Sequence, residues 1–185
     1  MRAPTLLLLA LLNTPIFAQS NGFVSGTISY SSDGDGNAFE MVVGPALGIN
    51  FSEQNVLGVA LNMTNSTTGA NGSAQRTTTV FEVAPFYRRM ISVGDRCSVY
   101  GQFLVGYGSG SYRTDATFDD SDFDFTTLRV ATSPGLFYNL SDRWALSAEW
   151  GLVQFQSLES EGVSNTELQL GVDLGSIGFS LNVLF

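Results

Sequence analysis

Bulky apolar residues recur at every second position along most of this chain, and polar stretches interrupt the pattern at intervals of about twenty residues. Alternation with a period of two is typical of β-strands, and the chain shows no helical periodicity. Eight segments carry the alternation. They are residues 23–31, 38–51, 56–64, 76–91, 97–113, 123–140, 144–157 and a last segment that ends at Phe185.

The connections between these segments alternate between short and long. Residues 52–55, 93–96 and 141–143 are tight turns, whereas 32–37, 65–75, 114–122 and 159–165 are longer and rich in Gly, Ser, Asn and Asp. An even number of long strands, joined alternately by short turns and long loops, is typical of outer-membrane barrels. We therefore predict an all-β fold, an eight-stranded antiparallel up-and-down transmembrane β-barrel.

The two faces of the predicted strands differ in a way that identifies the solvent on each side. In residues 38–51, one face carries Phe39, Met41, Val43, Leu47, Ile49 and Phe51, and the other carries Glu40, Gly44, Ala46, Gly48 and Asn50. A water-soluble barrel places its bulky side chains inside and its charges outside. Here the small and charged face must line the interior, so the bulky face requires lipid. Aromatic residues near the strand ends suit interfacial girdles, namely Tyr30, Phe51, Tyr87, Tyr107, Tyr138 and Trp144.

The last segment changes parity. Apolar residues occupy even positions up to Leu174 and odd positions from Ile177 onward, which indicates a bulge or break around Gly175 and Ser176. We expect residues 177–185 to cross the membrane and residues 167–174 to extend above it.

The first residues read as an export signal. Arg2 precedes an apolar run, Pro15 breaks that run, and the small residue Ala18 follows. We predict a signal peptide over residues 1–18 and one barrel domain over residues 19–185.

The composition excludes several kinds of chemistry. The chain has no His, and all eight of its cations are Arg, so imidazole bases, His-ligated metals and lysine chemistry are excluded. A net charge of −9 argues against a nucleic-acid partner. The single Cys97 cannot form an internal disulfide, and we interpret it as a small residue at a strand start.

A few charged residues fall on the interior face. An eight-stranded lumen is just wide enough to be filled by side chains, and charges buried there must be paired. We predict a lumenal ion-pair network of Arg129, Glu40, Glu82 and Glu149, with hydrogen bonds to Gln102, Asn62 or buried water. Two interpretations stay open: a static plug, or a gate whose rearrangement opens a narrow ion path.

The predicted loops carry most of the acidic residues. Residues 33–37 begin like a calcium-binding loop, but Ala38 replaces the turn glycine and Gly44 stands where the bidentate Glu belongs. A second acidic cluster comprises Asp115, Asp119, Asp120, Asp122 and Asp124. We interpret both clusters as solvated turns and assign no metal site and no cofactor.

The chain ends on an aromatic residue preceded by alternating apolar residues. With the signal peptide and the rhythm of strands and loops, this ending resembles the small outer-membrane β-barrel family, the OmpA/OmpX-like barrels. The resemblance covers essentially the whole chain after the leader and implies a location in the cell outer membrane. It also implies that Phe179, Leu181, Val183 and Phe185 form the C-terminal signal read by the barrel-assembly machinery. Enzymes among such barrels use a histidine, which this chain lacks, so we predict that it is not an enzyme.

We therefore expect a non-enzymatic outer-membrane protein with a structural or surface-interaction role, of the adhesion or resistance type, and with acidic extracellular loops. Its expected partners are outer-membrane lipid and lipopolysaccharide, and the assembly machinery during biogenesis. We expect a monomer with its N-terminus and turns in the periplasm, and the sequence identifies no extracellular partner. Two alternatives stay open: a narrow ion-conducting pore gated by the lumenal network, and a secreted, soluble, lipocalin-like binding barrel.

Overall fold

The computed structural model describes residues 22–32, 38–69, 75–115, 123–151, 153–160, 163–170 and 177–185. None of these residues belongs to a helix long and apolar enough to cross a membrane. The predicted signal peptide, residues 1–18, lies outside the described residues, as do the loop positions Asp33, Asp35, Asp119, Asp120 and Asp122. The strands are β1 (Gly22–Ser32), β2 (Ala38–Ser52), β3 (Asn55–Thr68), β4 (Gln75–Ser92), β5 (Cys97–Asp115), β6 (Phe123–Asn139), β7 (Trp144–Trp150), β8 (Val153–Ser160), β9 (Val163–Leu170) and β10 (Ile177–Leu184).

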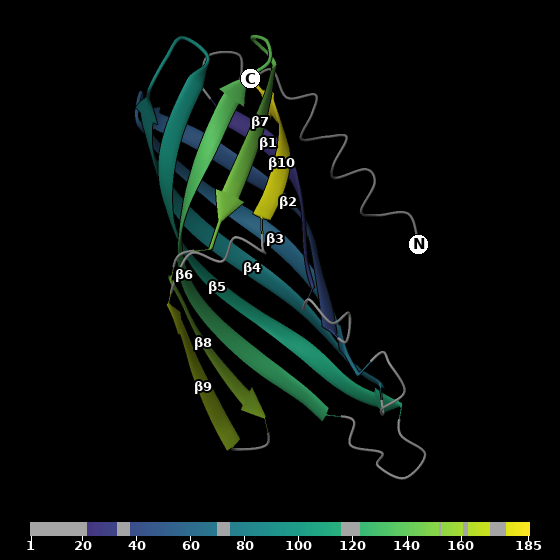
Figure 1. Cartoon of the computed structure of the whole chain (residues 1–185). Helices are drawn as coiled ribbons and strands as arrows, with labels where there is room; N and C mark the ends of the chain where they lie inside the picture. The colour runs from purple at the N-terminus through teal and green to yellow at the C-terminus, as the bar shows by residue number, and fades with distance from the viewer. Residues whose placement is uncertain are drawn as a thin grey trace, which may run out of the picture.

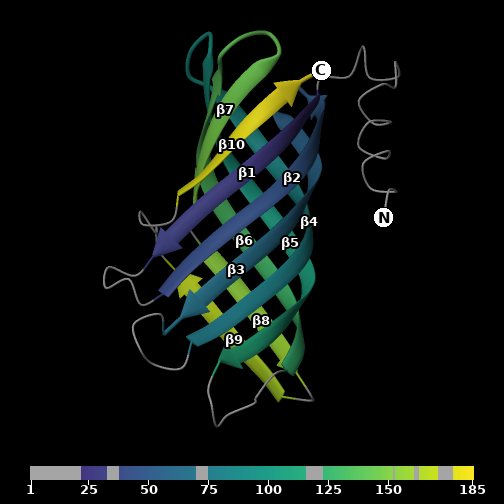
Figure 2. The same ribbon diagram turned by 90° about the vertical axis from the view of Figure 1, so that its right-hand side faces the viewer.

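The strands close into a barrel. β1 to β6 pair in chain order, β6 pairs with β7, β7 with β10, and β10 with β1, all of them antiparallel. The tight turns after β2, β4 and β6 lie with the start of β1 and the end of β10, and we call this the turn end; the opposite end is the loop end (Figures 1 and 2). The predicted eight-stranded antiparallel barrel is therefore confirmed.

The seventh predicted segment is two strands, so its prediction as one continuous strand was wrong. β6 pairs Gly135 with Glu149 of β7, but it pairs Thr132 with Val153 of β8. Three steps along β6 thus correspond to four steps along its neighbours, which is the signature of a β-bulge. The extra residue reverses parity, so that Glu149 faces the lumen in β7 whereas Gln156 does so in β8, opposite Arg129.

The eighth predicted segment is also interrupted. β10 pairs with β1 and β7, while β9 pairs with β8. Leu168 of β9 and Phe179 of β10 are both exposed on the outer face, although one number is even and the other odd. The predicted change of parity is confirmed, and the residues where it occurs, 171–176, lie outside the described part of the chain.

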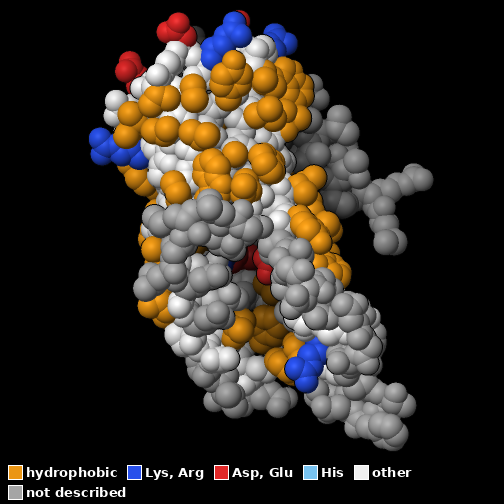
Figure 3. Space-filling model, in the orientation of Figure 1, with side chains coloured by type: hydrophobic (Ala, Val, Ile, Leu, Met, Phe, Trp, Pro, Cys, Tyr) orange, Lys and Arg blue, Asp and Glu red, His pale blue; other side chains and the backbone are white. Residues whose placement is uncertain are grey.

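The outer face carries a broad apolar band. Exposed Leu, Ile, Val, Met and aromatic side chains cover it, including all six aromatic residues that we assigned to the girdles. Figure 3 shows this hydrophobic surface and the charged side chains that cap it at the turn end. Toward the loop end the outward positions change to hydroxyl and carboxylate side chains, as at Thr79, Ser109, Thr126 and Glu159. The band therefore ends before the strands do.

The strands continue further toward the loop end than the sequence pattern predicts. β3 runs to Thr68 and β8 to Ser160, so parts of the predicted loops 65–75 and 159–165 are strand. These stretches carry polar residues on both faces, and the alternation that marks a strand inside lipid is absent there. Strands β4 to β6 are 17 to 19 residues long, whereas β1 has 11.

The lumen at the turn end is an aromatic core, which corrects the expectation of an interior lined only by small and polar residues. Phe23, Phe86, Tyr100 and Phe137 are all buried there. Glycines on neighbouring strands make room for these rings: a Cβ on Gly58 would collide with Phe86, and one on Gly135 would collide with Tyr100. The large rings therefore pack against small residues of neighbouring strands, and side chains fill the barrel at this end.

Candidate functional site: the polar lumen

The first lumenal network joins β4 to β6 across β5. Arg129 donates from Nε and Nη2 to Glu82, at 2.9 and 2.5 Å, and Asn62 donates to the same carboxylate at 3.0 Å. The contact passes over Gly106 of β5, where a Cβ would collide with the Glu82 carboxylate. A glycine is required at this position because the two charged groups meet above its backbone.

Glu40 lies near this pair without joining it. Its side chain is exposed, and it is attracted electrostatically by Arg129, although no ion pair within 4 Å joins the two among the described residues. Arg129 therefore attracts three carboxylates, Glu82 in contact and Glu149 and Glu40 at longer range.

The second network lies closer to the turn end. Arg88, Gln102 and Ser133 are paired across β4, β5 and β6, so their side chains form one row inside the barrel. Arg88 donates two hydrogen bonds to Gln102 Oε1, at 3.0 and 2.8 Å. Glu149 of β7 accepts from Ser133 at 2.8 Å and from Gln102 and Tyr100 at 3.2 Å, and Arg88 Nη2 lies 3.9 Å from it.

Arg88 is also enclosed by aromatic rings. Its guanidinium carbon lies 4.1 Å from the ring centre of Tyr100, 5.2 Å from that of Phe23 and 5.5 Å from that of Phe86. The faces of aromatic rings attract cations, most strongly where water is excluded. Arg88 thus links the polar row to the aromatic core, and we call these four side chains the Arg88 cage.

The predicted site residues are divided between the two networks. Arg129 and Glu82 are brought together, and Asn62 joins them, whereas Glu149 and Gln102 belong to the second network, with Arg88. The two networks cross β6 at Arg129 and at Ser133, four positions apart, so they lie roughly 13 Å apart along the strand. The role of Arg88 was not predicted from the sequence. It could have been inferred from the alternation, which places Arg88 on the inward face together with the aromatic residues Phe86 and Tyr100.

The proposed C-terminal signal lies on the outer face of β10. Phe179, Leu181 and Val183 are exposed there, and Phe185 is exposed directly after the strand. The backbone of Phe185 exchanges two hydrogen bonds with that of Gly22, at 2.9 and 3.0 Å, and so completes the closure between the two described termini.

In both lumenal networks, carboxylates are paired with arginines and with hydrogen-bond donors. Glu82 accepts from Arg129 and Asn62, and Glu149 accepts from Ser133, Gln102 and Tyr100. Within the described ranges, no group of three or more His, Cys, Asp or Glu is placed to hold a metal ion. The arrangement can brace and fill the barrel, and its turn end is filled by the aromatic core.

Comparison with known proteins agrees with this architecture. A family model described as the outer membrane protein beta-barrel domain matches residues 5–175. No match was found among curated proteins. The structure is similar to that of Neisserial surface protein A, with a TM-score of 0.57 and 13% identity over 90% of this chain and 97% of that one.

Two further structures show weaker likeness. The N-terminal β-barrel domain of Pseudomonas aeruginosa OprF has a TM-score of 0.44 and 11% identity, covering 90% of this chain and all of that one. Ail of Yersinia pestis has a TM-score of 0.44 and 12% identity, covering 89% and 95%. Since the family model spans most of the sequence and the fold agrees, this chain belongs to the outer-membrane β-barrel protein family.

Proposed function

We propose that this chain is a non-enzymatic surface protein of the outer membrane, with its loop end outside the cell, that binds partners through the part of the sheet that projects above the lipid. One observation carries the proposal: β4, β5 and β6 continue beyond the apolar band with polar residues facing outward. Those residues are Thr77, Thr79, Ser109, Ser111, Asp124 and Thr126. Such a surface is compatible with water and not with hydrocarbon.

Charge suggests the class of partner. The loops and strand ends at the loop end hold Asp33, Asp35, Asp115, Asp119, Asp120, Asp122, Asp124, Glu159 and Glu161, against Arg76 and Arg113. An excess of one sign at an exposed end steers molecules of opposite charge toward it. A basic protein surface is therefore the favoured partner.

The competing functions are supported less well. A pore needs a continuous water path, and the aromatic core and the Arg88 cage occupy the turn end of the lumen. The enzymes among small outer-membrane barrels use a histidine, and this sequence contains none. A soluble lipocalin-like binder would not present an apolar band on its outer face.

The proposal is tested with bacteria that display the protein, using beads coated with polylysine or with polyglutamate. We expect displayed protein to increase retention of polylysine beads severalfold, and the gain to shrink between about 10 and 150 mM salt as screening increases. Replacing Asp119, Asp120 and Asp122 with Asn should remove most of the gain.

A matched variant changes three acids at the other end, Glu53, Asp95 and Asp142, to their amides. These residues lie in or beside the tight turns, and their change should leave retention as it is in the wild type. Equal losses in both variants, or no gain from the displayed protein, would contradict the proposed surface role.

A further inference from the structure

The hairpin of β8 and β9 forms one margin of the sheet at the loop end (Figure 1). β8 pairs with β6 on one side and with β9 on the other, but β9 pairs with no second strand among the described residues. The strand that closes the ring at the turn end, β1, pairs with β10 and not with β9. In the described part of the chain, one long edge of β9 therefore presents unpaired backbone N–H and C=O groups.

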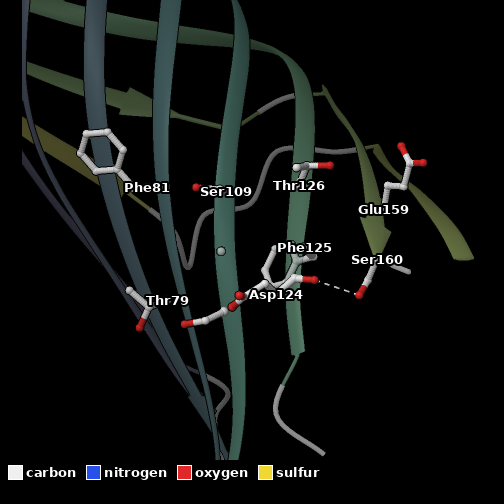
Figure 4. A pocket seen from close by; sticks show the side chains of 10 residues that line it. Thr79, Phe81, Ser109, Asp124, Phe125, Thr126, Glu159 and Ser160 are labelled. Carbon is white, nitrogen blue, oxygen red and sulfur yellow. Dashed lines mark hydrogen bonds between the residues drawn. The ribbon is translucent and has the colours of Figure 1, made fainter. Parts of the chain in front are cut away.

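The hairpin is firmly attached to the barrel on its other side. β8 pairs with β6 over the whole of residues 153–159. The hydroxyl of Ser160 donates to the backbone oxygen of Asp124 at 2.9 Å, as the dashed line in Figure 4 marks. On the lumenal face, Gln156 donates to the hydroxyl of Thr127 at 3.3 Å. The open edge is therefore carried by paired β-structure and not by a loop.

The open edge begins at the level of the apolar band and continues beyond it. Leu168 is exposed and is paired with Phe155, which is also exposed. The next outward position toward the loop end is Thr166, which is polar and exposed. In the orientation proposed above, residues 163–166 thus lie outside the lipid, where a partner protein can reach them.

This edge lacks the features that usually prevent another strand from pairing. Natural edge strands are blocked by their shortness, by Lys or Pro, or by a bulge. β9 has eight residues, contains no Pro, Lys or Arg, and pairs with β8 without a bulge. Its single charged residue is Glu167. The edge is thus open to strand addition, in which an extended segment of a partner pairs its backbone with that of β9.

Charge indicates which kind of segment fits. The hairpin and its turn contain Glu159, Glu161 and Glu167, and the chain has no Arg after Arg143. A second copy of the chain would bring the same charges to this edge, and like charges on adjacent strands are destabilising. An extended segment rich in Lys or Arg complements them.

We propose that β9 binds an extended, basic segment of a partner protein by strand addition. The inference rests on the proposed function, because it names the place and the mode in which the basic partner binds. Backbone hydrogen bonds supply the affinity, and the Lys or Arg side chains select the segment. Strand addition needs the backbone N–H groups of the partner, whereas attraction between charges does not.

The first test uses the full barrel in lipid nanodiscs and a short peptide in which valine alternates with lysine. Its control is the same peptide with N-methylated backbone amides, which keeps the charge and the side chains but cannot donate hydrogen bonds to β9. We expect the control to bind about tenfold more weakly in calorimetry. Equal affinities of the two peptides, or no binding of the parent peptide at millimolar concentration, would overturn the proposal.

The second test locates the bound peptide. Thr166 of β9 and Ser157 of β8 are paired, so they lie in one row on adjacent strands. A strand added to β9 would lie about 5 Å from Thr166 and about 10 Å from Ser157. In a Cys97→Ser background, we expect a peptide with one cysteine to form about tenfold more disulfide with Thr166→Cys than with Ser157→Cys. Equal yields would overturn the proposal, as would disulfide-linked dimers of Thr166→Cys without peptide, which would place a second copy at the edge.

The outcomes separate this inference from the proposed function. Retention of polylysine beads together with equal binding of the two peptides would leave the surface role standing and overturn strand addition. Failure of both the beads and the parent peptide to bind would overturn both.

Discussion

Replacing Arg88 with alanine is expected to lower the free energy of unfolding of the refolded barrel by about 3 kcal/mol. The guanidinium lies between three aromatic rings, the nearest ring centre being 4.1 Å away, and donates two hydrogen bonds to Gln102. Its removal leaves a cavity in the aromatic core and takes from Glu149 the nearest cation, at 3.9 Å. Cavity and unpaired carboxylate both destabilise the folded barrel.

The neighbouring residue provides the control. Arg89 has the same side chain one position along β4, but it is exposed and faces outward. Arg89→Ala should change the free energy of unfolding by less than about 0.5 kcal/mol. Urea titration in lipid vesicles, followed by the heat-dependent gel shift of the folded form, measures both variants, and equal losses of stability would show that the Arg88 cage does not hold the turn end together.

The second large effect is expected at Arg129. Arg129→Ala leaves the buried Glu82 without the cation that it contacts, so we expect a loss of about 3 kcal/mol. Glu82→Ala should cost less, about 1.5 kcal/mol, because Arg129 is still attracted by Glu149 and Glu40. The inequality follows because one cation attracts three carboxylates, of which only Glu82 is in contact with it.

A double-mutant cycle checks this account. We expect a favourable coupling of about 1–3 kcal/mol between Arg129 and Glu82 in the same urea titrations. A loss for Glu82→Ala that equals or exceeds that for Arg129→Ala would contradict the assignment.

In planar bilayers the conductance of Arg129→Ala should match that of the wild type, because the aromatic core lies between Arg129 and the turn end. A new open state of the variant would instead favour the gated pore.

Most of the barrel could be predicted from the sequence because a strand with lipid on one side and a packed lumen on the other must alternate between bulky apolar and small or polar residues. Where a strand crosses the apolar band, as in residues 38–51, bulky and small residues alternate, and the predicted ends agree with the structure within a few residues. Beyond the apolar band both faces of the strands are polar, so the alternation that predicts a strand is missing from the extensions of β3 and β8. The bulge between β7 and β8 was not predicted because one extra residue between two strands changes the alternation of a single sequence at only one point.

The lumen was harder to predict, since pairing depends on register and depth. A buried Arg needs a carboxylate partner, so the sequence predicts that Arg129 pairs with a Glu, but it does not show which of the three inward Glu residues is the partner. The register of β4, β5 and β6 identifies Glu82, whose carboxylate meets Arg129 above Gly106. The aromatic rings inside the turn end were hidden for another reason. Phe86 and Tyr100 fall on a face whose other residues are small or polar. The alternation of residue types along one strand does not show that glycines on neighbouring strands leave space for these rings.

The central claim is that the bulky face of the strands contacts lipid, and the two tryptophans of the chain test it most directly. Trp144 and Trp150 both lie on the outward face of β7, about 15 Å apart along the barrel axis. In vesicles, lipids brominated on their acyl chains should quench their fluorescence strongly, and aqueous iodide should quench it little. Strong quenching by iodide with no effect of brominated lipid would contradict the lipid-facing assignment and favour a barrel dissolved in water.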